Sequence, residues 1–218
     1  MNIKSKLFRE LASFCNKNFD LEKCFVCMCG SYASDSFTKD SDLDLLFAVE
    51  KYNSVEFRKI RDFVVDLHTK NGLKLDEEVP YETKLVVSYK DIEDAICLKA
   101  FPEKDFGYAI NPITYNKEFL ASRELHLRII LNALTTPNVY IHGDRVKYAD
   151  FTQRVEKAII RLARGLTSEK NPNKDEILRV LLNGKNGEEG QAHLGYKKDK
   201  TKAIEHLEDI IFRNIKIY

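Results

Sequence analysis

Residues 23–45 read KCFVCMCGSYASDSFTKDSDLDL, and the order of apolar and polar residues along this stretch decides the fold. The apolar run at 24–29 is short enough to be a buried strand. Gly30-Ser31 follows at the point where a strand would turn into a helix, and Asp42-Leu43-Asp44 then opens a second apolar run. The stretch therefore predicts a strand, a short helix, and a second strand over 43–49.

Asp42 and Asp44 stand two residues apart at the start of the second predicted strand. Residues two apart in a strand point to the same face, so the two carboxylates project together while Leu43 faces the other way. Adjacent carboxylates repel each other, and burying either charge without a partner is costly. The usual relief is a hard divalent cation with oxygen ligands, most often Mg²⁺. The spacing therefore predicts a metal site here.

Gly30 and Ser31 have the chemistry of a phosphate-binding turn. A glycine lets backbone approach a phosphate closely, the start of a helix favours anions, and a serine hydroxyl adds one more donor. Gly30-Ser31 followed by Asp42-x-Asp44 resembles the core motif of the DNA polymerase β-like nucleotidyltransferase superfamily, in particular its minimal nucleotidyltransferases. The resemblance covers about residues 24–88.

The resemblance implies a function for each motif residue. Gly30 and Ser31 would hold a nucleoside triphosphate, ATP for example, at a helix N-terminus. Asp42 and Asp44 would bind two Mg²⁺ ions, for which Mn²⁺ could substitute, and two metals clamp the attacking and leaving oxygens of an in-line displacement. In this family a third carboxylate comes from a later strand, where it also accepts the proton of the acceptor.

Residues 73–79, LKLDEEV, alternate apolar and polar side chains as a strand does. Asp76 fits the third carboxylate of the resembling family best, as base and metal ligand. Glu78 shares its face and is the alternative ligand, so the sequence leaves two positions open. An edge strand with ordinary acidic residues is the structural alternative.

Charge and composition narrow the kinds of acceptor. The 218 residues include 35 Lys and Arg against 34 Asp and Glu, which gives a net charge of +1. A protein that follows a long nucleic acid usually carries a basic excess, so this balance favours a small or compact acceptor. No apolar run approaches the ~20 residues of a membrane span, and the N-terminus has no long apolar segment of a secretory signal. We therefore expect a cytoplasmic protein with no membrane partner.

Five cysteines are present, and three of them lie in the first predicted strand, at Cys24, Cys27 and Cys29. The odd count and uneven spacing argue against a disulfide framework. This cluster could bind a metal or act in redox chemistry, but cysteine also behaves as a small hydrophobe. The position inside a buried strand favours that second interpretation.

The rest of the chain is predicted to be mainly helical. Apolar spacing and caps predict helices at 3–18, 54–71 with Ser54 as N-cap, from Asp91 onward, and at 117–135, 150–166 with Asp150 as cap, 174–183 and 201–213, with a possible antiparallel strand at 84–87. We expect an α+β fold in two domains. Residues 1–100 would form a nucleotidyltransferase-type mixed sheet with flanking helices, and 101–218 a helical acceptor-binding domain.

Several features outside the motif have both a functional and a structural interpretation. The aromatic residues of 101–116 could stack on a base or serve as packing anchors, and His142 could be an acid or base or a turn residue. A basic stripe could face phosphate or form a solvated helix face, and it consists of Arg154, Lys157, Arg161 and Arg164. The glycine-rich segment 184–198 could be a flap over the site.

The sequence thus leads to one functional hypothesis and two alternatives. The hypothesis is a metal-dependent enzyme that moves a nucleoside monophosphate from a nucleoside triphosphate to a small-molecule acceptor and releases pyrophosphate. The first alternative is nucleotidylation of a protein or a tRNA, as in toxin–antitoxin pairs. The second is a sensor that binds a nucleotide without transferring it. The acceptor, the preferred triphosphate and the oligomeric state are left open.

Overall fold

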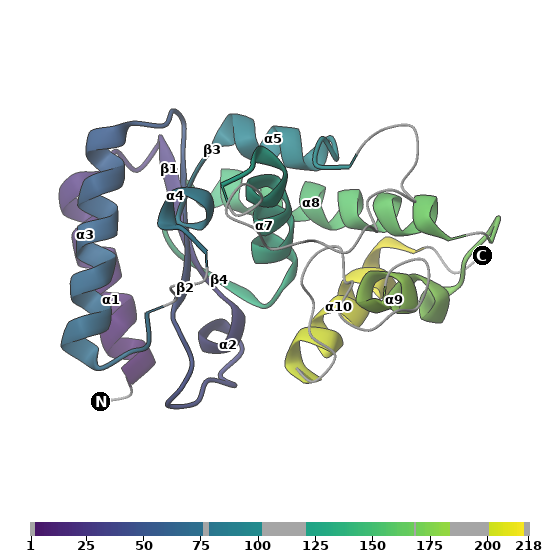
Figure 1. The fold of residues 1–218 in the computed structure, drawn as a ribbon, viewed down its shortest axis with the longest axis horizontal. Coiled ribbons are helices and arrows are strands. Elements are labelled where there is room, and N and C mark those ends of the chain that lie inside the picture. The colour runs from purple at the N-terminus through teal and green to yellow at the C-terminus, as the bar shows by residue number, and fades with distance from the viewer. Residues whose placement is uncertain (1–2, 76–78, 102–120, 168, 184–200, 216–218) are drawn as a thin grey trace.

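The computed structural model describes residues 3–75, 79–101, 121–167, 169–183 and 201–215 of the chain (Figure 1). In chain order its elements are α1 (Ile3–Asn18), β1 (Cys24–Cys29), α2 (Gly30–Ala33), β2 (Asp44–Val49), α3 (Ser54–Asn71), α4 (Tyr81–Lys84), β3 (Val86–Ser88), α5 (Tyr89–Ile96), α7 (Arg123–Thr135), β4 (Asn138–Gly143), α8 (Arg145–Leu166), α9 (Lys174–Asn183) and α10 (Thr201–Asn214). A mixed sheet with flanking helices is followed by further helices, so the predicted α+β class is confirmed.

The described strands form one four-stranded sheet in the order β3-β2-β1-β4. β1 pairs antiparallel with both β2 and β4, whereas β3 pairs parallel with β2. In the register between β1 and β2, Cys29 lies opposite Asp44. The last residue of β1 and the first residue of β2 therefore meet at one end of the sheet, and the motif predicted from the sequence lies at that end.

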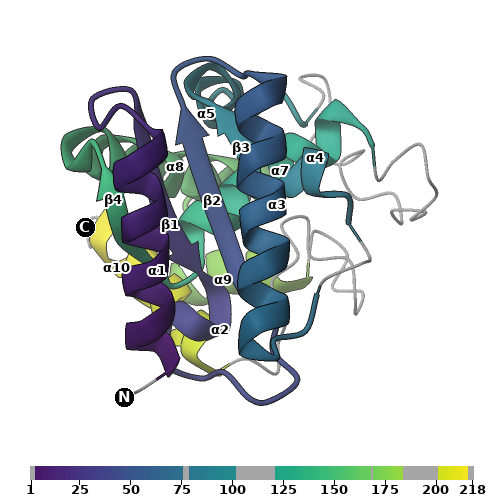
Figure 2. The same cartoon turned by 90° about the vertical axis from the view of Figure 1, so that its left-hand side faces the viewer.

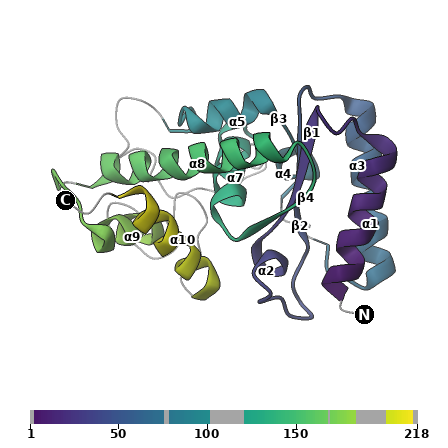
Figure 3. The same cartoon turned by 180° about the vertical axis from the view of Figure 1, so that it is seen from behind.

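Helices cover both faces of the sheet. α1 and α3 lie side by side on one face (Figure 2), and α5, α7 and α8 lie on the opposite side (Figure 3). All of β1 is buried because it is covered from both sides. Phe25, Cys27 and Cys29 pack into the core with α5, α7 and α8, while Val26 and Met28 pack into the core with α1 and α3. The cysteines of β1 are buried free thiols, as is Cys15, and Cys97 is an exposed one.

α9 and α10 extend the core away from the sheet. Their buried side chains, Ile177, Val180, Leu207 and Ile210 among them, belong to the same apolar cluster as Phe25 of β1. In the described part of the chain no helix has both the length and the apolar character needed to cross a membrane.

Helix ends follow local capping chemistry, and three predicted N-caps are wrong, by one to six residues. The N-cap of α3 is Asn53, not Ser54, because the Asn53 side chain accepts hydrogen bonds from the next free N–H groups of the helix. The N-cap of α8 is Asp144, not Asp150, for the same reason. Gly72 ends α3 with φ 64°, a left-handed conformation that glycine adopts without a steric penalty.

The start of α5 is a capping box. The Ser88 hydroxyl accepts from the Asp91 N–H at 3.1 Å, and the Asp91 carboxylate accepts from the Ser88 N–H at 2.7 Å. The predicted cap at Asp91 is therefore corrected to Ser88, with Asp91 as its reciprocal partner inside the first turn.

The predicted antiparallel strand at 84–87 is wrong in extent and direction. Tyr81–Lys84 form the short helix α4, which follows Pro80, and only Val86–Ser88 form a strand, β3, parallel to β2. Proline fixes φ near the value that a helix start requires, and a four-residue helix leaves too little apolar periodicity to be recognised.

Asn138–Gly143 form β4, a strand that the sequence analysis did not predict. β4 pairs with β1, which lies far away in the sequence, so its strand conformation depends on a tertiary partner. The sheet therefore includes residues from beyond residue 100. The division into domains at 1–100 and 101–218 stays a prediction, and residues 102–120, with most of the aromatic segment, lie outside the described residues.

Candidate active site

Gly30 is held close to Asp44 by the pairing of β1 with β2. Gly30 has φ 66°, and a Cβ built on it would lie 2.6 Å from the Asp44 Oδ2, a distance too short for two atoms that are not bonded. The Gly30 N–H donates to the Pro137 carbonyl at 2.9 Å. Gly30 therefore contributes space for the Asp44 carboxylate, whereas its own N–H is engaged at the start of β4.

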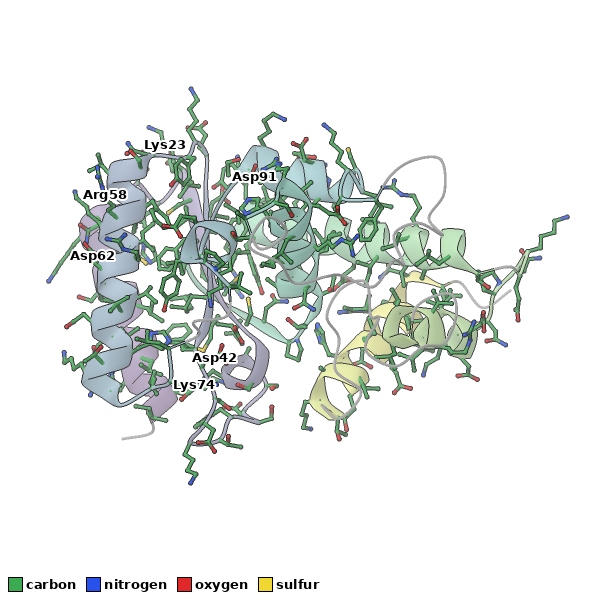
Figure 4. The ribbon with its side chains drawn as sticks, in the orientation of Figure 1. Lys23, Asp42, Arg58, Asp62, Lys74 and Asp91 are labelled. Atoms are coloured by element: carbon green, nitrogen blue, oxygen red, sulfur yellow. The ribbon has the colours of Figure 1, made fainter. Side chains whose placement is uncertain are left out.

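Asp42 and Asp44 lie at the entrance to β2 with Leu43 between them. Leu43 is buried in the core with α1 and α3, while Asp42 is partly exposed and Asp44 is exposed. Asp42 forms a parallel β-bridge with Lys74, which brings the chain after α3 alongside it (Figure 4). The bridge directs residues 73–75 along the start of β2, next to the two carboxylates.

One cavity of about 260 Å³ collects the motif residues. Gly30, Ser31, Asp42 and Asp44 all line it. Its other walls come from several elements: Val64 and His68 of α3, Tyr81 and Lys84 of α4, Ile129, Asn132 and Ala133 of α7, and Ala203 of α10. The structure thus brings together four of the residues that the sequence singled out, and it surrounds them with side chains from both the N-terminal and the C-terminal parts of the chain.

α2, which carries Ser31, has only four residues. So short a helix has a small dipole, and the Gly30 N–H already donates to Pro137, so the predicted helix N-terminus offers mainly the N–H groups that follow Gly30. The Ser34 hydroxyl lies 3.1 and 3.2 Å from the Gly30 and Ser31 carbonyl oxygens, which share its single proton. These bonds hold the turn and leave the Ser31 side chain at the cavity.

His68 is a cavity residue that the sequence analysis did not identify. It is buried, and its Nδ1 lies 2.7 Å from the Val64 carbonyl, which can only accept. Burial lowers the pKa of His68 most, and Lys84 lowers it too, against smaller raising effects from the Val64 bond and the charge of Asp42. The ring is therefore neutral, with its proton on Nδ1 and a lone pair on Nε2. His68 lies on the apolar side of α3, so the sequence pattern gave no indication that it has a function.

α4 adds a cation and an aromatic ring to the cavity wall. The Lys84 Nζ lies 5.1 Å from the centre of the Tyr81 ring, within the range of a cation–π contact. Asp42, Lys84 and His68 all line the cavity, and the charges of Asp42 and Lys84 shift the pKa of His68 in opposite directions. The sequence carries no sign of a role for Lys84, because the pattern of residues 84–87 predicts a strand.

Oxygen ligands in the cavity suit a hard cation, but the described residues supply only part of a ligand set. Two carboxylates, Asp42 and Asp44, are present. Within the described ranges, no three His, Cys, Asp or Glu side chains form a group that could hold a metal ion. Asp76 and Glu78 lie outside those ranges, so the third carboxylate stays a prediction.

Other candidates from the sequence lie away from the cavity. His142 is in β4 beside Val26, is mostly buried, and has a pKa lowered by burial. In the basic stripe, Arg154 pairs with Glu93 and Asp150. Arg161 donates to the Ile96 carbonyl at 2.6 Å. These two arginines therefore link α8 to α5, which favours a structural role for the basic stripe over phosphate binding. The glycine-rich segment 184–198 lies outside the described residues.

Comparison with known proteins gives evidence for the family that does not depend on the geometry of the site. Neither the curated proteins nor the solved structures contain a match to this chain. Residues 8–134, which include β1, β2, α4 and all of α7 but its last residue, match the family model described as a nucleotidyltransferase domain. Because that match covers more than half of the 218 residues, the chain belongs to the nucleotidyltransferase domain family of the polymerase β-like superfamily.

Proposed function

We propose that this protein transfers a nucleoside monophosphate from a nucleoside triphosphate to a small-molecule acceptor, with divalent cations and with release of pyrophosphate. The observation that supports this most is the position of the Asp44 carboxylate in the space where a Gly30 side chain would be, inside a cavity that Ser31 and Asp42 also line. Membership of the family supports nucleotidyl transfer in general. The acceptor class and the metal are the parts that we add.

Each residue of the predicted motif has a task in the proposed reaction. Ser31 and the N–H groups of α2 that follow Gly30 bind the triphosphate, and Gly30 keeps the turn close to the carboxylates. Asp42 and Asp44 hold the divalent cations, Mg²⁺ or Mn²⁺, and Asp76, or Glu78 in its place, completes the set and accepts the proton of the acceptor. When bound, the cations would neutralise charge that develops on the phosphate oxygens. Lys84 supplies a further positive charge on the same wall.

The acceptor would meet the wall formed by α7 and α10. Ile129, Asn132 and Ala133 of α7 and Ala203 of α10 face the cavity, and none of them is charged. The volume of about 260 Å³ is just below the range of about 300–1,000 Å³ that is typical of small-molecule sites. Together with a net charge of +1, this supports a small acceptor over a long nucleic acid backbone.

The test is pyrophosphate release and transfer of label from an α-labelled triphosphate with Mg²⁺, using pools of small metabolites as acceptors. We expect Asp42→Asn and Asp44→Asn each to lower the rate by more than about a hundredfold, because each removes a charged ligand. Asp40→Asn is the matched control, because Asp40 is an exposed carboxylate of the same loop and does not line the cavity. Unchanged transfer by Asp42→Asn would contradict the proposal.

The same experiment separates the alternatives. Label that appears on a protein or on tRNA, with none on small metabolites, would replace the small-molecule acceptor by a macromolecular one. Tight triphosphate binding in calorimetry without any release of pyrophosphate would identify a sensor.

A further inference from the structure

We propose that His126 of α7 is a positioning residue that holds α4, and with it Lys84 and Tyr81, in the wall of the cavity. The inference rests on the proposed function for its catalytic consequence. The contacts that support it lie outside the predicted motif, between α4, α5 and α7.

Both ring nitrogens of His126 contact groups that only accept hydrogen bonds. Nδ1 lies 2.6 Å from the Thr83 carbonyl, and Nε2 lies 3.3 Å from the Asp91 Oδ2. The side chain is only 12% exposed, so water competes little for either nitrogen. Because a carbonyl and a carboxylate only accept, each ring nitrogen can bond its partner only as a donor. His126 thus links α4 to α5 through its own ring.

Asp91, the residue of α5 that His126 contacts, is held in place by further bonds. Asp91, labelled in Figure 4, is the partner of Ser88 in the capping box and also forms an ion pair with Arg123, which reaches Asp94 at 2.8 Å as well. Burial alone would raise the pKa of Asp91, but the hydrogen bonds from His126, Ser88 and Arg123 outweigh it and hold that pKa well below its usual range. Asp91 is therefore a charged anchor that orients the His126 ring.

The α4 end of the link determines the path of the cavity wall. The Thr83 carbonyl belongs to the peptide bond that joins Thr83 to Lys84, so the bond from His126 fixes the backbone of Lys84 directly. α4 has only four residues, and helices this short are not stable by themselves. Its own bonds include Thr83 N–H to Pro80 O and Leu85 N–H to Tyr81 O, both 2.9 Å. The conformation of α4 therefore depends on contacts such as the one from α7.

Two variants separate the two halves of the link. In His126→Asn the amide nitrogen takes the place of Nδ1 and can still donate to the Thr83 carbonyl. In His126→Gln the amide nitrogen takes the place of Nε2 and can reach only Asp91. We expect His126→Gln to raise the KM for the triphosphate about tenfold with a smaller change in kcat, while His126→Asn stays close to the wild type.

Hydrogen exchange provides a readout that does not depend on activity. The Thr83 and Leu85 amides should exchange faster in His126→Gln than in the wild type, and His126→Asn should restore their protection, with the β1 and β2 amides unchanged in all three proteins. Equal exchange in the two variants, or a KM that changes alike in both, would overturn the role of His126. A wild type that transfers no nucleotide but shows the expected exchange pattern would instead refute the proposed function alone.

Discussion

Gly30 explains why a single residue type is required at the turn after β1. Its φ of 66° is accessible to other residues only with strain, and its missing side chain leaves room for the Asp44 carboxylate. The two requirements are independent, because Gly72 has nearly the same φ, 64°, but has nothing within 4 Å of its Cβ position. The chain therefore contains its own control for backbone strain.

Replacement of these two glycines by alanine should separate strain from catalysis. Gly30→Ala and Gly72→Ala should each lower the free energy of unfolding by about 1 kcal/mol, the cost of a left-handed alanine. Only Gly30→Ala should also reduce nucleotidyl transfer, by more than about tenfold, because its methyl group must displace the Asp44 carboxylate. Urea unfolding and initial rates measure the two effects. Equal activity of the two variants would show that Gly30 matters only for the backbone.

The ion pairs of Asp91 and Asp94 in α5 with Arg123 in α7 predict that the stability of the protein depends on pH. Asp94 bonds to Lys99, Lys90 and Arg123, which lower its pKa to about 2 against the opposing effect of burial, and the pKa of Asp91 is also held below its usual range. Acids with lowered pKa values stabilise the fold above their unfolded value of about 4, and that contribution is lost as pH falls through the folded value. Stability should therefore fall between about pH 4 and pH 2.

Asp91→Asn should flatten this part of the curve. Its unfolding free energy should change less over the same pH range than that of the wild type, because one titrating anchor is gone. Urea midpoints at several pH values measure the difference, with Asp40→Asn as the control for an exposed carboxylate. Parallel curves for Asp91→Asn and the wild type would show that the Asp91 carboxylate does not contribute to the pH dependence of stability.

Elements defined by local sequence were predictable, and elements defined by distant partners were not. The apolar run at 24–29 and the Gly72 stop carry their own signals, so β1 and the end of α3 were placed correctly. β4 and α4 depend on β1 and on His126, which no local pattern records. The same holds for the cavity. The spacing of Asp42 and Asp44 predicted that they lie together, but nothing in the sequence predicted that His68 and Lys84 also line the cavity.

One apolar core links the sheet to the last helices. Phe25 and Leu46 of the sheet belong to the same buried cluster as Ile159 of α8 and Ile211 of α10. A core that continues across the predicted boundary at residue 100 favours cooperative unfolding. Urea unfolding followed by circular dichroism and by tyrosine fluorescence should therefore give one coincident transition. Two separate transitions would show that 1–100 and 101–218 unfold as independent domains.

The fate of the phosphates is the most direct test of the central claim. The protein is incubated with Mg²⁺ and acceptor pools in two parallel reactions, one with triphosphate labelled at the α-phosphate and one with triphosphate labelled at the γ-phosphate. We predict that the α-label moves to the acceptor and the γ-label appears in pyrophosphate in equal amounts. Release of the γ-label as inorganic phosphate, with the α-label left on a nucleoside diphosphate, would contradict nucleotidyl transfer at this site.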